Sequence, residues 1–287
     1  MKLYYYVYTG HKIGLDRLRR AVVILKKLEE EGIDTVLLVS DFRAGLVARD
    51  YGVHGAVNIE GIQDIDAIAQ MGDSIIIDSP EDDHGRMVKY MSDFKKVFRF
   101  ANSDEDKSLY GEVIFSLDCL DEDCLTSIIV DDIYFKEHKK EERTLFFLGD
   151  FDTDKTILSN IDFFEAFDME LLLGNYFYVK YENDLAKIFK RLYEPEEYVD
   201  LICSSSRVVT ASFQTALEAS VTGAEVIFVE VRKLTAKEKE ILSSNFIIII
   251  SNLNKNIYKQ NIISSVSSSC NNVEKSDNVV KKIIKEL

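Results

Sequence analysis

Residues 3–39 read LYYYVYTGHKIGLDRLRRAVVILKKLEEEGIDTVLLV, and this stretch decides the fold class. Residues 3–8 form a compact apolar and aromatic run that is typical of a β-strand. Apolar residues then follow helical spacing over residues 15–28, and Gly32 stands where the C-terminal cap of a helix belongs. A second apolar run follows at residues 35–39. The stretch predicts a βαβ unit whose strands are buried on both faces of a parallel sheet.

The same alternation continues through the first half of the chain. We expect strands at 56–59, 74–77, 96–100 and 112–115, with helices at 44–50 and 65–70 between them. Ser79-Pro80-Glu81-Asp82 reads as an N-cap, a first-turn proline and two acidic residues, which predicts that another helix opens there. Strands that alternate with helices imply parallel pairing and right-handed crossovers.

A second α/β region follows a charged stretch at residues 136–142, which is the best linker candidate. We expect strands at 144–148, 170–173, 208–210, 226–231 and 246–250, and helices at 155–167, 184–192, 214–221, 236–242 and 279–287. The Ser- and Asn-rich residues 264–272 read as a loop. The predicted architecture is therefore two Rossmann-like lobes, 1–140 and 141–287, with a ligand cleft between them.

Composition and charge narrow the classes of function. The 287 residues are 46% apolar and 30% charged, which is ordinary for a globular protein. The net charge of −15 argues against nucleic acid as a partner, because phosphate neutralisation needs clustered lysines and arginines. No apolar run is long enough to span a bilayer, and the first eight residues lack the apolar core of a signal peptide. We therefore expect a cytoplasmic protein.

The four cysteines, Cys119, Cys124, Cys203 and Cys270, include no CxxC pair and have no histidine at ligand spacing. This pattern indicates neither a zinc site nor a disulfide framework, so we expect reduced thiols and no bound metal.

The loop after the first strand is a candidate ligand site, because ligands of open α/β sheets bind beyond the carboxyl ends of the strands. Gly10 and Gly14 allow a close backbone approach, but their spacing is not the GxGxxG of a dinucleotide site. His11, Arg17 and Arg20 bring a base and two cations to the start of the first helix. The alternative interpretation is a solvated basic face.

The second lobe carries a more specific segment at residues 207–229, RVVTASFQTALEASVTGAEVIFV. It reads as strand, small polar turn, helix, glycine and strand. Ser212 can cap the helix while the helix amides face a diphosphate, and Glu218 can accept hydrogen bonds from ribose hydroxyls. The alternative is that Ser212 is only an N-cap and Glu218 only a surface charge.

This segment resembles the nucleotide-diphosphate site of GT-B glycosyltransferases and of the MurG-like UDP-sugar hydrolase of pseudaminic acid biosynthesis. The resemblance implies that the turn and helix N-terminus receive the diphosphate and that the glutamate receives the ribose. The residues to which it assigns these roles are Ser212, Phe213, Gln214, Thr215 and Glu218.

The first lobe shows the same likeness, because residues 12–20, KIGLDRLRR, resemble the hydrolase loop Q-I-G-x-G-H-x-x-R. Gly14 and Arg20 match, whereas Asp16 stands in place of a glycine and Arg17 in place of the histidine that activates water in that family. Arginine cannot act as a general base near neutral pH. The remaining candidates for a base are His11 and Asp16.

Two further loops resemble the hydrolase in part. Asp78 matches the acid of an Asp-His-Tyr motif, but Ser79 and Pro80 replace the two ring side chains. Gly149 and Asp150 lie in a loop similar to Gly-Gly-x-Asp, with one glycine lost. Asp78, Gly149 and Asp150 are therefore candidate residues of phosphate or sugar loops.

The resemblance implies a UDP-sugar glycosyltransferase or hydrolase of surface or flagellar glycan synthesis, whose ligand is the UDP-sugar and which needs no other cofactor. The substitutions in the first lobe keep an alternative open. In that alternative the chain is a catalytically inactive GT-B-like protein with a binding, regulatory or assembly role and a protein partner.

Overall fold

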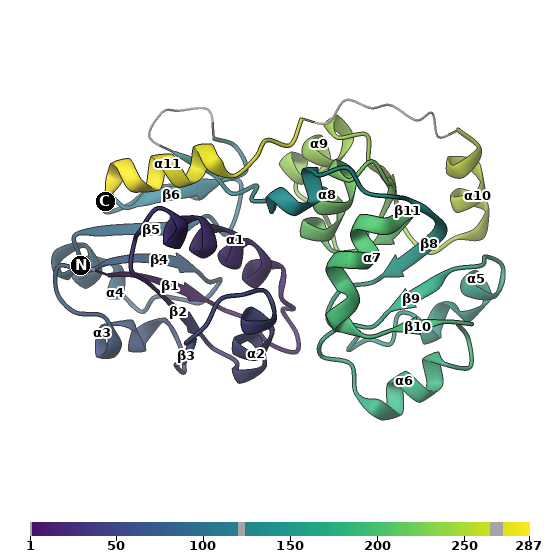
Figure 1. Ribbon diagram of the computed structural model, residues 1–287, viewed down its shortest axis with the longest axis horizontal. Helices are drawn as coiled ribbons and strands as arrows, with labels where there is room; N and C mark the ends of the chain where they lie inside the picture. Colours follow the sequence, from purple (N-terminus) through teal and green to yellow (C-terminus); the bar gives the residue numbers. More distant parts are fainter. Residues whose placement is uncertain (1, 120–123, 265–271) are drawn as a thin grey trace. The chain divides into compact units, whose positions relative to one another are not determined.

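The computed structural model describes residues 2–119, 124–264 and 272–287. The chain divides into two compact units, shown in Figure 1. The first unit comprises Met1–Ile129 and Lys275–Leu287, and the second comprises Val130–Glu274. The fold class is α/β, as the sequence predicts, with one parallel sheet in each unit.

The first unit is built on a seven-stranded parallel sheet in the order β3-β2-β1-β4-β5-β6-β7. Its strands are β1 (Leu3–Val7), β2 (Thr35–Val39), β3 (Val57–Asn58), β4 (Ser74–Asp78), β5 (Lys96–Phe100), β6 (Val113–Ser116) and β7 (Leu125–Thr126). Its helices are α1 (Asp16–Glu30), α2 (Phe42–Asp50), η1 (Ile62–Asp64), α3 (Ile65–Ile68), α4 (Arg86–Asp93) and α11 (Asp277–Glu286). Gly32 has φ of 80°, as expected of the residue that ends α1.

The tyrosines of β1 explain why this strand can occupy the middle of the sheet. All five residues of β1 are buried, and the strand pairs in parallel with β2 and with β4. The Tyr5 hydroxyl donates to Asp78 at 3.3 Å and the Tyr6 hydroxyl donates to Glu81 at 2.5 Å. Each ring therefore fills the core while its polar end reaches a partner near the carboxyl end of the sheet.

The second unit is built on a six-stranded parallel sheet in the order β10-β9-β8-β11-β12-β13. Its strands are β8 (Glu141–Phe147), β9 (Glu170–Leu172), β10 (Leu192–Tyr193), β11 (Ser205–Thr210), β12 (Glu225–Val229) and β13 (Ile248–Ile250). Its helices are η2 (Asp132–Phe135), η3 (Leu158–Asn160), α5 (Ile161–Glu165), α6 (Val179–Leu185), η4 (Pro195–Glu197), α7 (Tyr198–Ser204), α8 (Phe213–Val221), α9 (Ala236–Ser244) and α10 (Lys255–Ser264).

Aromatic side chains fill the core on one face of this sheet. The Phe146 ring of β8 meets the edge of Phe164 at a centroid distance of 4.8 Å, and Phe163 meets Tyr258 of α10 at 5.3 Å. Each fully buried side chain of this size contributes about 1.5–3 kcal/mol. The cluster therefore holds α5 and α10 on the same face as one core.

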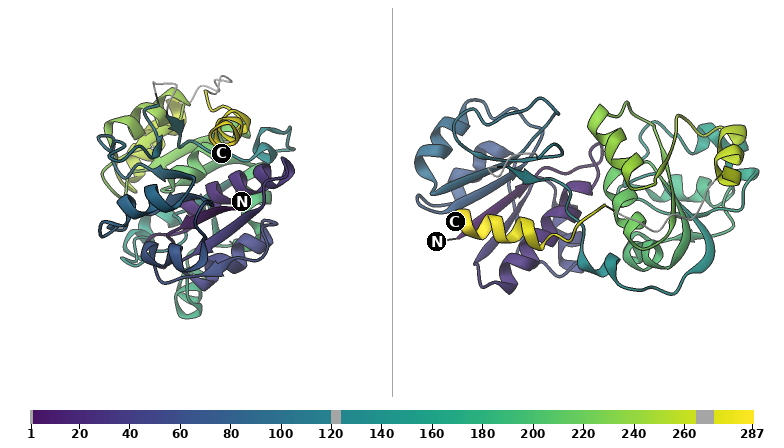
Figure 2. Two further views of the ribbon diagram at one scale, coloured as in Figure 1. Left: turned by 90° about the vertical axis from the view of Figure 1, so that its left-hand side faces the viewer. Right: turned by 90° about the horizontal axis from the view of Figure 1, so that it is seen from above.

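The observed division differs from the predicted lobes 1–140 and 141–287. The chain leaves the first unit after Ile129, and the last helix returns to that unit. Val279, Val280 and Ile283 of α11 are buried, and the helix packs against α1 and β7 (Figures 1 and 2). The terminal helix was predicted correctly as amphipathic, but its apolar face does not by itself reveal which sheet it covers.

The helix expected to open at Ser79 does not form there. The Ser79 hydroxyl accepts from the Glu81 amide at 3.1 Å and donates to the Glu81 carboxylate at 2.8 Å. Because Tyr6 also holds this carboxylate, residues 79–81 form a polar turn instead of a first helical turn. The next helix, α4, begins only after Gly85, whose φ is 80°.

Two helices expected in the second unit are also wrong in extent. Over residues 155–167 the chain forms only η3 and α5, because Asp152 captures the amides of Thr156 at 2.6 Å and Ile157 at 3.0 Å in a turn. Over residues 184–192 the helix α6 ends at Leu185, and Leu192 already pairs with Leu171 as the start of β10.

The expectation of reduced thiols is wrong for two of the four cysteines. Cys119 and Cys124 form a disulfide with a Cα–Cα distance of 5.5 Å. They flank the short connection between the parallel strands β6 and β7, and this pairing brings them within disulfide range. Cys203 is free and buried, whereas Cys270 lies outside the described residues.

Across the described part of the chain, no helix has both the length and the apolar character that a membrane crossing requires.

Lys140 gives the second unit a pH-dependent stability. Its ammonium donates to the Cys203 carbonyl oxygen at 2.8 Å and to the Thr222 hydroxyl at 2.7 Å, and burial lowers its pKa from 10.5 to about 8. Between these two pH values the unfolded chain binds more protons than the folded chain, so the free energy of unfolding rises with pH.

Relative to Lys140→Met, we expect the free energy of unfolding of the wild type to rise by about 1 kcal/mol between pH 7.5 and pH 10, after allowance for partial exposure. Urea unfolding at both pH values measures this gain, and an unchanged difference between the two proteins would contradict it.

The disulfide is expected to stabilise the first unit. Cys119 and Cys124 are separated by five positions, and closing so short a loop stabilises by about 2 kcal/mol through the unfolded state. Dithiothreitol should therefore lower the urea midpoint of the wild type. The double variant Cys119→Ser/Cys124→Ser should show the lower midpoint already and should not respond to the reductant.

Candidate functional site

The carboxyl edge of the first sheet has a point where the strand order reverses. The chain leads from β1 to β2 on one side and from β4 to β5 on the other, while β1 and β4 lie next to each other. Ligands of open parallel sheets bind at such reversals. The loop between β1 and α1 and the turn after β4 therefore form the first candidate region.

The loop after β1 is a tight turn closed by two glycines. The amides of Ile13 and Gly14 both donate to the Gly10 carbonyl oxygen at 2.9 Å. Gly14 adopts φ of 80°, a conformation that other residues rarely take. This closure leaves His11 exposed on the loop.

Asp78 brings together two of the predicted cations. Arg20 donates to it through Nε at 2.6 Å and through a second nitrogen, and Arg17 Nε lies 3.3 Å from Asp78 Oδ1. Asp78 is 0% exposed, so its charge is balanced mainly by these guanidinium groups. The alternative of a solvated basic face is wrong for both arginines, because both point to the buried carboxylate.

The environment acts differently on the two arginines. Burial lowers the pKa of Arg17 despite the opposing charge of Asp78. Burial also opposes the charge of Arg20, but the charge and the hydrogen bonds of Asp78 raise the pKa of Arg20 overall. Both groups remain cations near neutral pH, so Arg17 cannot accept a proton as a histidine could.

The other two base candidates lie in different surroundings. The carboxylate of Asp16 lies 3.1 Å from the guanidinium of the buried Arg19. His11 is exposed and forms no ion pair or hydrogen bond with the described residues. Of the two remaining candidates, Asp16 is thus held in an ion pair with Arg19, whereas His11 is exposed.

Thr9, which opens the candidate loop, and Tyr5, which the sequence did not single out as a site residue, also belong to this region. The Tyr5 hydroxyl donates to Asp78, and burial raises the pKa of Tyr5 well above its ordinary value. Thr9 is 4% exposed, and its hydroxyl has no hydrogen-bond partner among the described residues. Their apolar and small polar sequence context is typical of a strand and a turn, so the sequence does not indicate that they lie beside Asp78.

The second sheet has its own reversal, between β8 and β11. The chain leads from β8 to β9 on one side and from β11 to β12 on the other. The loop that starts at Gly149 follows β8, and the turn before α8 follows β11. The structure therefore brings the predicted glycine loop and the predicted diphosphate turn to neighbouring strand ends.

The loop after β8 is packed against the loop after β9. Asp150 is 2% exposed and accepts from the Asn175 side chain at 3.0 Å, so its carboxylate is held by an amide donor. A Cβ atom on Gly174 would lie 2.5 Å from the Gly149 carbonyl oxygen, and only glycine fits there. Gly174 and Asn175 are thus part of this loop pair, although the sequence did not single them out.

The turn before α8 has the geometry of a capped helix start. The Ser212 hydroxyl accepts from the Thr215 amide at 3.0 Å, which confirms that Ser212 is the N-cap. The Phe213 amide has no hydrogen-bond partner among the described residues. This amide and the positive end of the helix dipole are what an anion would meet.

Glu218 is buried, so the alternative that it is a surface charge is wrong. It is 1% exposed, and its oxygens accept from Gln214 Nε2 at 2.8 Å and from the Tyr198 hydroxyl at 2.6 Å. Tyr198 also lies 2.7 Å from the Thr215 hydroxyl. Tyr198 is a site residue that the sequence did not reveal, because it comes from α7, a helix that was not predicted.

A hollow of about 710 Å³ lies elsewhere in the second unit, between the starts of α5 and α10. It is lined by Leu158, Phe163, Asn254 and their neighbours, and by none of the residues predicted for the nucleotide.

No protein-family model matches the sequence, and no curated protein sequence matches it. Solved structures do match over almost the whole chain. UDP-GlcNAc 2-epimerase of Methanocaldococcus jannaschii, in complex with UDP-GlcNAc and UDP, is 12% identical, with 99% of each chain covered and a TM-score of 0.65. The Staphylococcus aureus MnaA–UDP structure is 12% identical, with 99% of this chain and 95% of that chain covered and a TM-score of 0.66.

Solved structures of glycosyltransferases match in addition to those of epimerases. AviGT4, a glycosyltransferase of avilamycin A biosynthesis, is 12% identical, with 100% of this chain and 96% of that chain covered and a TM-score of 0.56. Identity of this order shows the fold and not the activity. The chain therefore has a GT-B-like α/β fold with a parallel, Rossmann-like sheet in each unit.

Proposed function

We propose that the protein binds a UDP-sugar and acts on it as a glycosyltransferase or hydrolase of surface or flagellar glycan synthesis. The observation that carries this proposal is the start of α8, where an unbonded amide and a buried glutamate lie one and a half turns apart at a strand reversal. The structures that share this fold include proteins described as bound to UDP or UDP-GlcNAc, which supports a nucleotide-sugar ligand.

The diphosphate is assigned to the turn before α8. The Phe213 amide and the positive end of the helix dipole attract an anion locally, although the net charge of the chain is −15. Gly149 lies at the adjacent strand end and leaves the backbone open to a phosphate, as Gly149 carries no Cβ. The Asp150 carboxylate is buried within the loop pair and accepts a hydrogen bond from Asn175.

The ribose is assigned to Glu218. A carboxylate can accept about four hydrogen bonds, and Gln214 and Tyr198 are among the donors to Glu218. Gln214 lies one turn nearer the start of the helix, and its amide holds Oε1 as a ribose hydroxyl would hold it. In this proposal the Gln214 side chain gives way to the ribose.

Chemistry is assigned to the loop after β1. Arg17 and Arg20 form a fixed cationic pair around Asp78, suited to hold an anionic or polar part of the substrate and not to move a proton. His11 is the proposed general base. The reaction needs no organic cofactor in this proposal, because the activated sugar itself drives group transfer.

The Arg17–Asp78 contact favours a second candidate, a UDP-sugar-binding protein without turnover that acts in regulation or assembly through a protein partner. In this case Arg17 makes a structural ion pair with Asp78 and transfers no proton.

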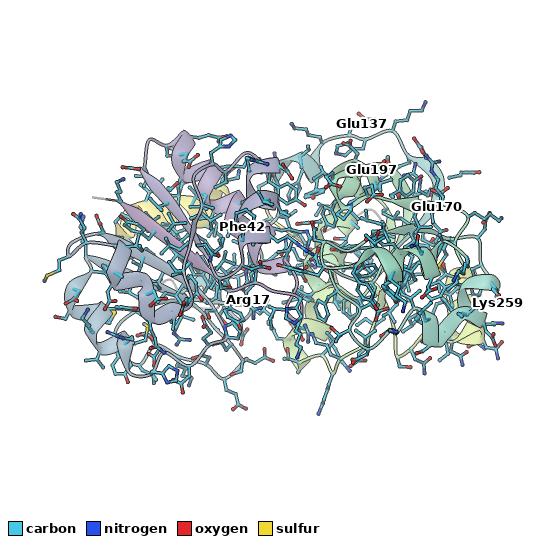
Figure 3. The ribbon with its side chains drawn as sticks, turned by 90° about the horizontal axis from the view of Figure 1, so that it is seen from below. Arg17, Phe42, Glu137, Glu170, Glu197 and Lys259 are labelled. Carbon is cyan, nitrogen blue, oxygen red and sulfur yellow. A yellow bond between two sulfur atoms is a disulfide. The ribbon has the colours of Figure 1, made fainter. Side chains whose placement is uncertain are left out.

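Titration calorimetry with UDP and UDP-GlcNAc tests the binding proposal. We expect Glu218→Gln to weaken UDP binding about tenfold, because a charged acceptor of ribose hydroxyls becomes neutral. Glu170→Gln is the matched control: this glutamate of β9, labelled in Figure 3, pairs with Arg143 at 3.0 Å and lies at the start of its strand, opposite the ligand edge. A wild type that binds no UDP at millimolar concentration would overturn the proposal.

Release of UDP from UDP-sugars distinguishes the two candidate functions. We expect the wild type to turn over and His11→Gln to lower kcat by about 10²- to 10⁴-fold, the usual contribution of a general base, with UDP affinity unchanged. Arg17→Lys keeps a cation and serves as the comparison. Binding without any turnover by the wild type would favour the second candidate function.

A further inference from the structure

Tyr198 is the first residue of α7 and lies in the core of the second unit. It is 2% exposed, and its ring meets Phe147 of β8 edge-on at a centroid distance of 5.3 Å. The ring therefore has a packing role that phenylalanine could fill equally well. Packing does not explain the presence of the hydroxyl group, which phenylalanine lacks.

The hydroxyl connects both halves of the proposed nucleotide site. It donates to Glu218 Oε2 at 2.6 Å and lies 2.7 Å from the Thr215 hydroxyl. Thr215 in turn lies 2.8 Å from the Ser212 hydroxyl, the cap of the diphosphate turn. The Tyr198 hydroxyl thus lies within hydrogen-bond distance of the ribose acceptor and of Thr215, which bonds to the cap of the phosphate turn.

Gln214 and Tyr198, both partners of Glu218, differ in how firmly they are fixed. Gln214 belongs to the same helix as Glu218, and its unbranched side chain has more rotatable bonds than a tyrosine ring. Tyr198 comes from a different helix, and its ring is locked by packing, so its hydroxyl stays in place. Tyr198 therefore determines where Oε2 lies, and through it the orientation of the whole carboxylate.

We propose that Tyr198 is a positioning residue that makes the site selective for a ribonucleotide, because it orients the Glu218 carboxylate toward the ribose hydroxyls. This inference rests on the proposed function, in which Glu218 receives the ribose. It adds the determinant that holds Glu218 ready and names the ligand class, a nucleoside diphosphate with an intact ribose.

The test compares the affinities of two probes, UDP and 2′,3′-dideoxy-UDP, for the wild type and for Tyr198→Phe. We expect the wild type to prefer UDP about tenfold, as one charge-assisted hydrogen bond would give. Tyr198→Phe should reduce this preference to less than about twofold, mainly because it weakens the binding of UDP. A merely structural role would weaken both probes equally and leave the ratio unchanged, which would overturn the proposal.

Tyr193→Phe is the matched control. Its hydroxyl also donates to a carboxylate, Glu170, at 2.6 Å, but at a strand that does not border the α8 turn. The UDP preference of this variant should equal that of the wild type.

A second variant keeps the test decisive if Tyr198→Phe folds poorly. Thr215→Val removes the link to the turn but leaves the bond between Tyr198 and Glu218. It should weaken both probes and retain the preference for UDP, and loss of the preference in this variant would overturn the proposal. A wild type that binds both probes equally overturns this inference alone, whereas one that binds neither overturns the proposed function as well.

Discussion

The parallel pairing of β11 with both β8 and β12 is the constraint on which the proposed site depends. It aligns the carboxyl ends of these strands, so the loop at Gly149 and the start of α8 meet at one edge of the sheet. A helix that starts there leaves backbone donors that its own turns cannot satisfy. Ser212 satisfies one of them, and the Phe213 amide stays available. The position of the proposed anion site thus follows from topology before any side chain is considered.

Side chains then give this edge its selectivity. Glu218 would be costly to bury alone, and the structure offsets that cost with donors from Gln214 and Tyr198. The same polar contacts fix the carboxylate in one orientation. A buried network of this kind stabilises the unit and, in our proposal, also determines which nucleotide fits.

The first unit follows the same topological rule with different chemistry. Its reversal point carries a buried carboxylate, Asp78, held between Arg17 and Arg20. An arginine pair of this kind can bind and orient a ligand, but proton transfer must come from elsewhere. Our proposal therefore separates binding by the arginines from proton transfer by His11.

The sequence alone determined the fold class and most of the core strands, because hydrophobic periodicity is a local property. The strands at 35–39 and 96–100 were predicted with their observed bounds, and Ser212 was identified as a helix cap. Interactions between distant residues decided the rest. The turn at Ser79 depends on Tyr6, the disulfide depends on the pairing of β6 with β7, and the unit that α11 joins depends on α1. Only the tertiary structure revealed Tyr198 beside Glu218, because the two side chains meet through packing of α7 on α8, which no local pattern encodes.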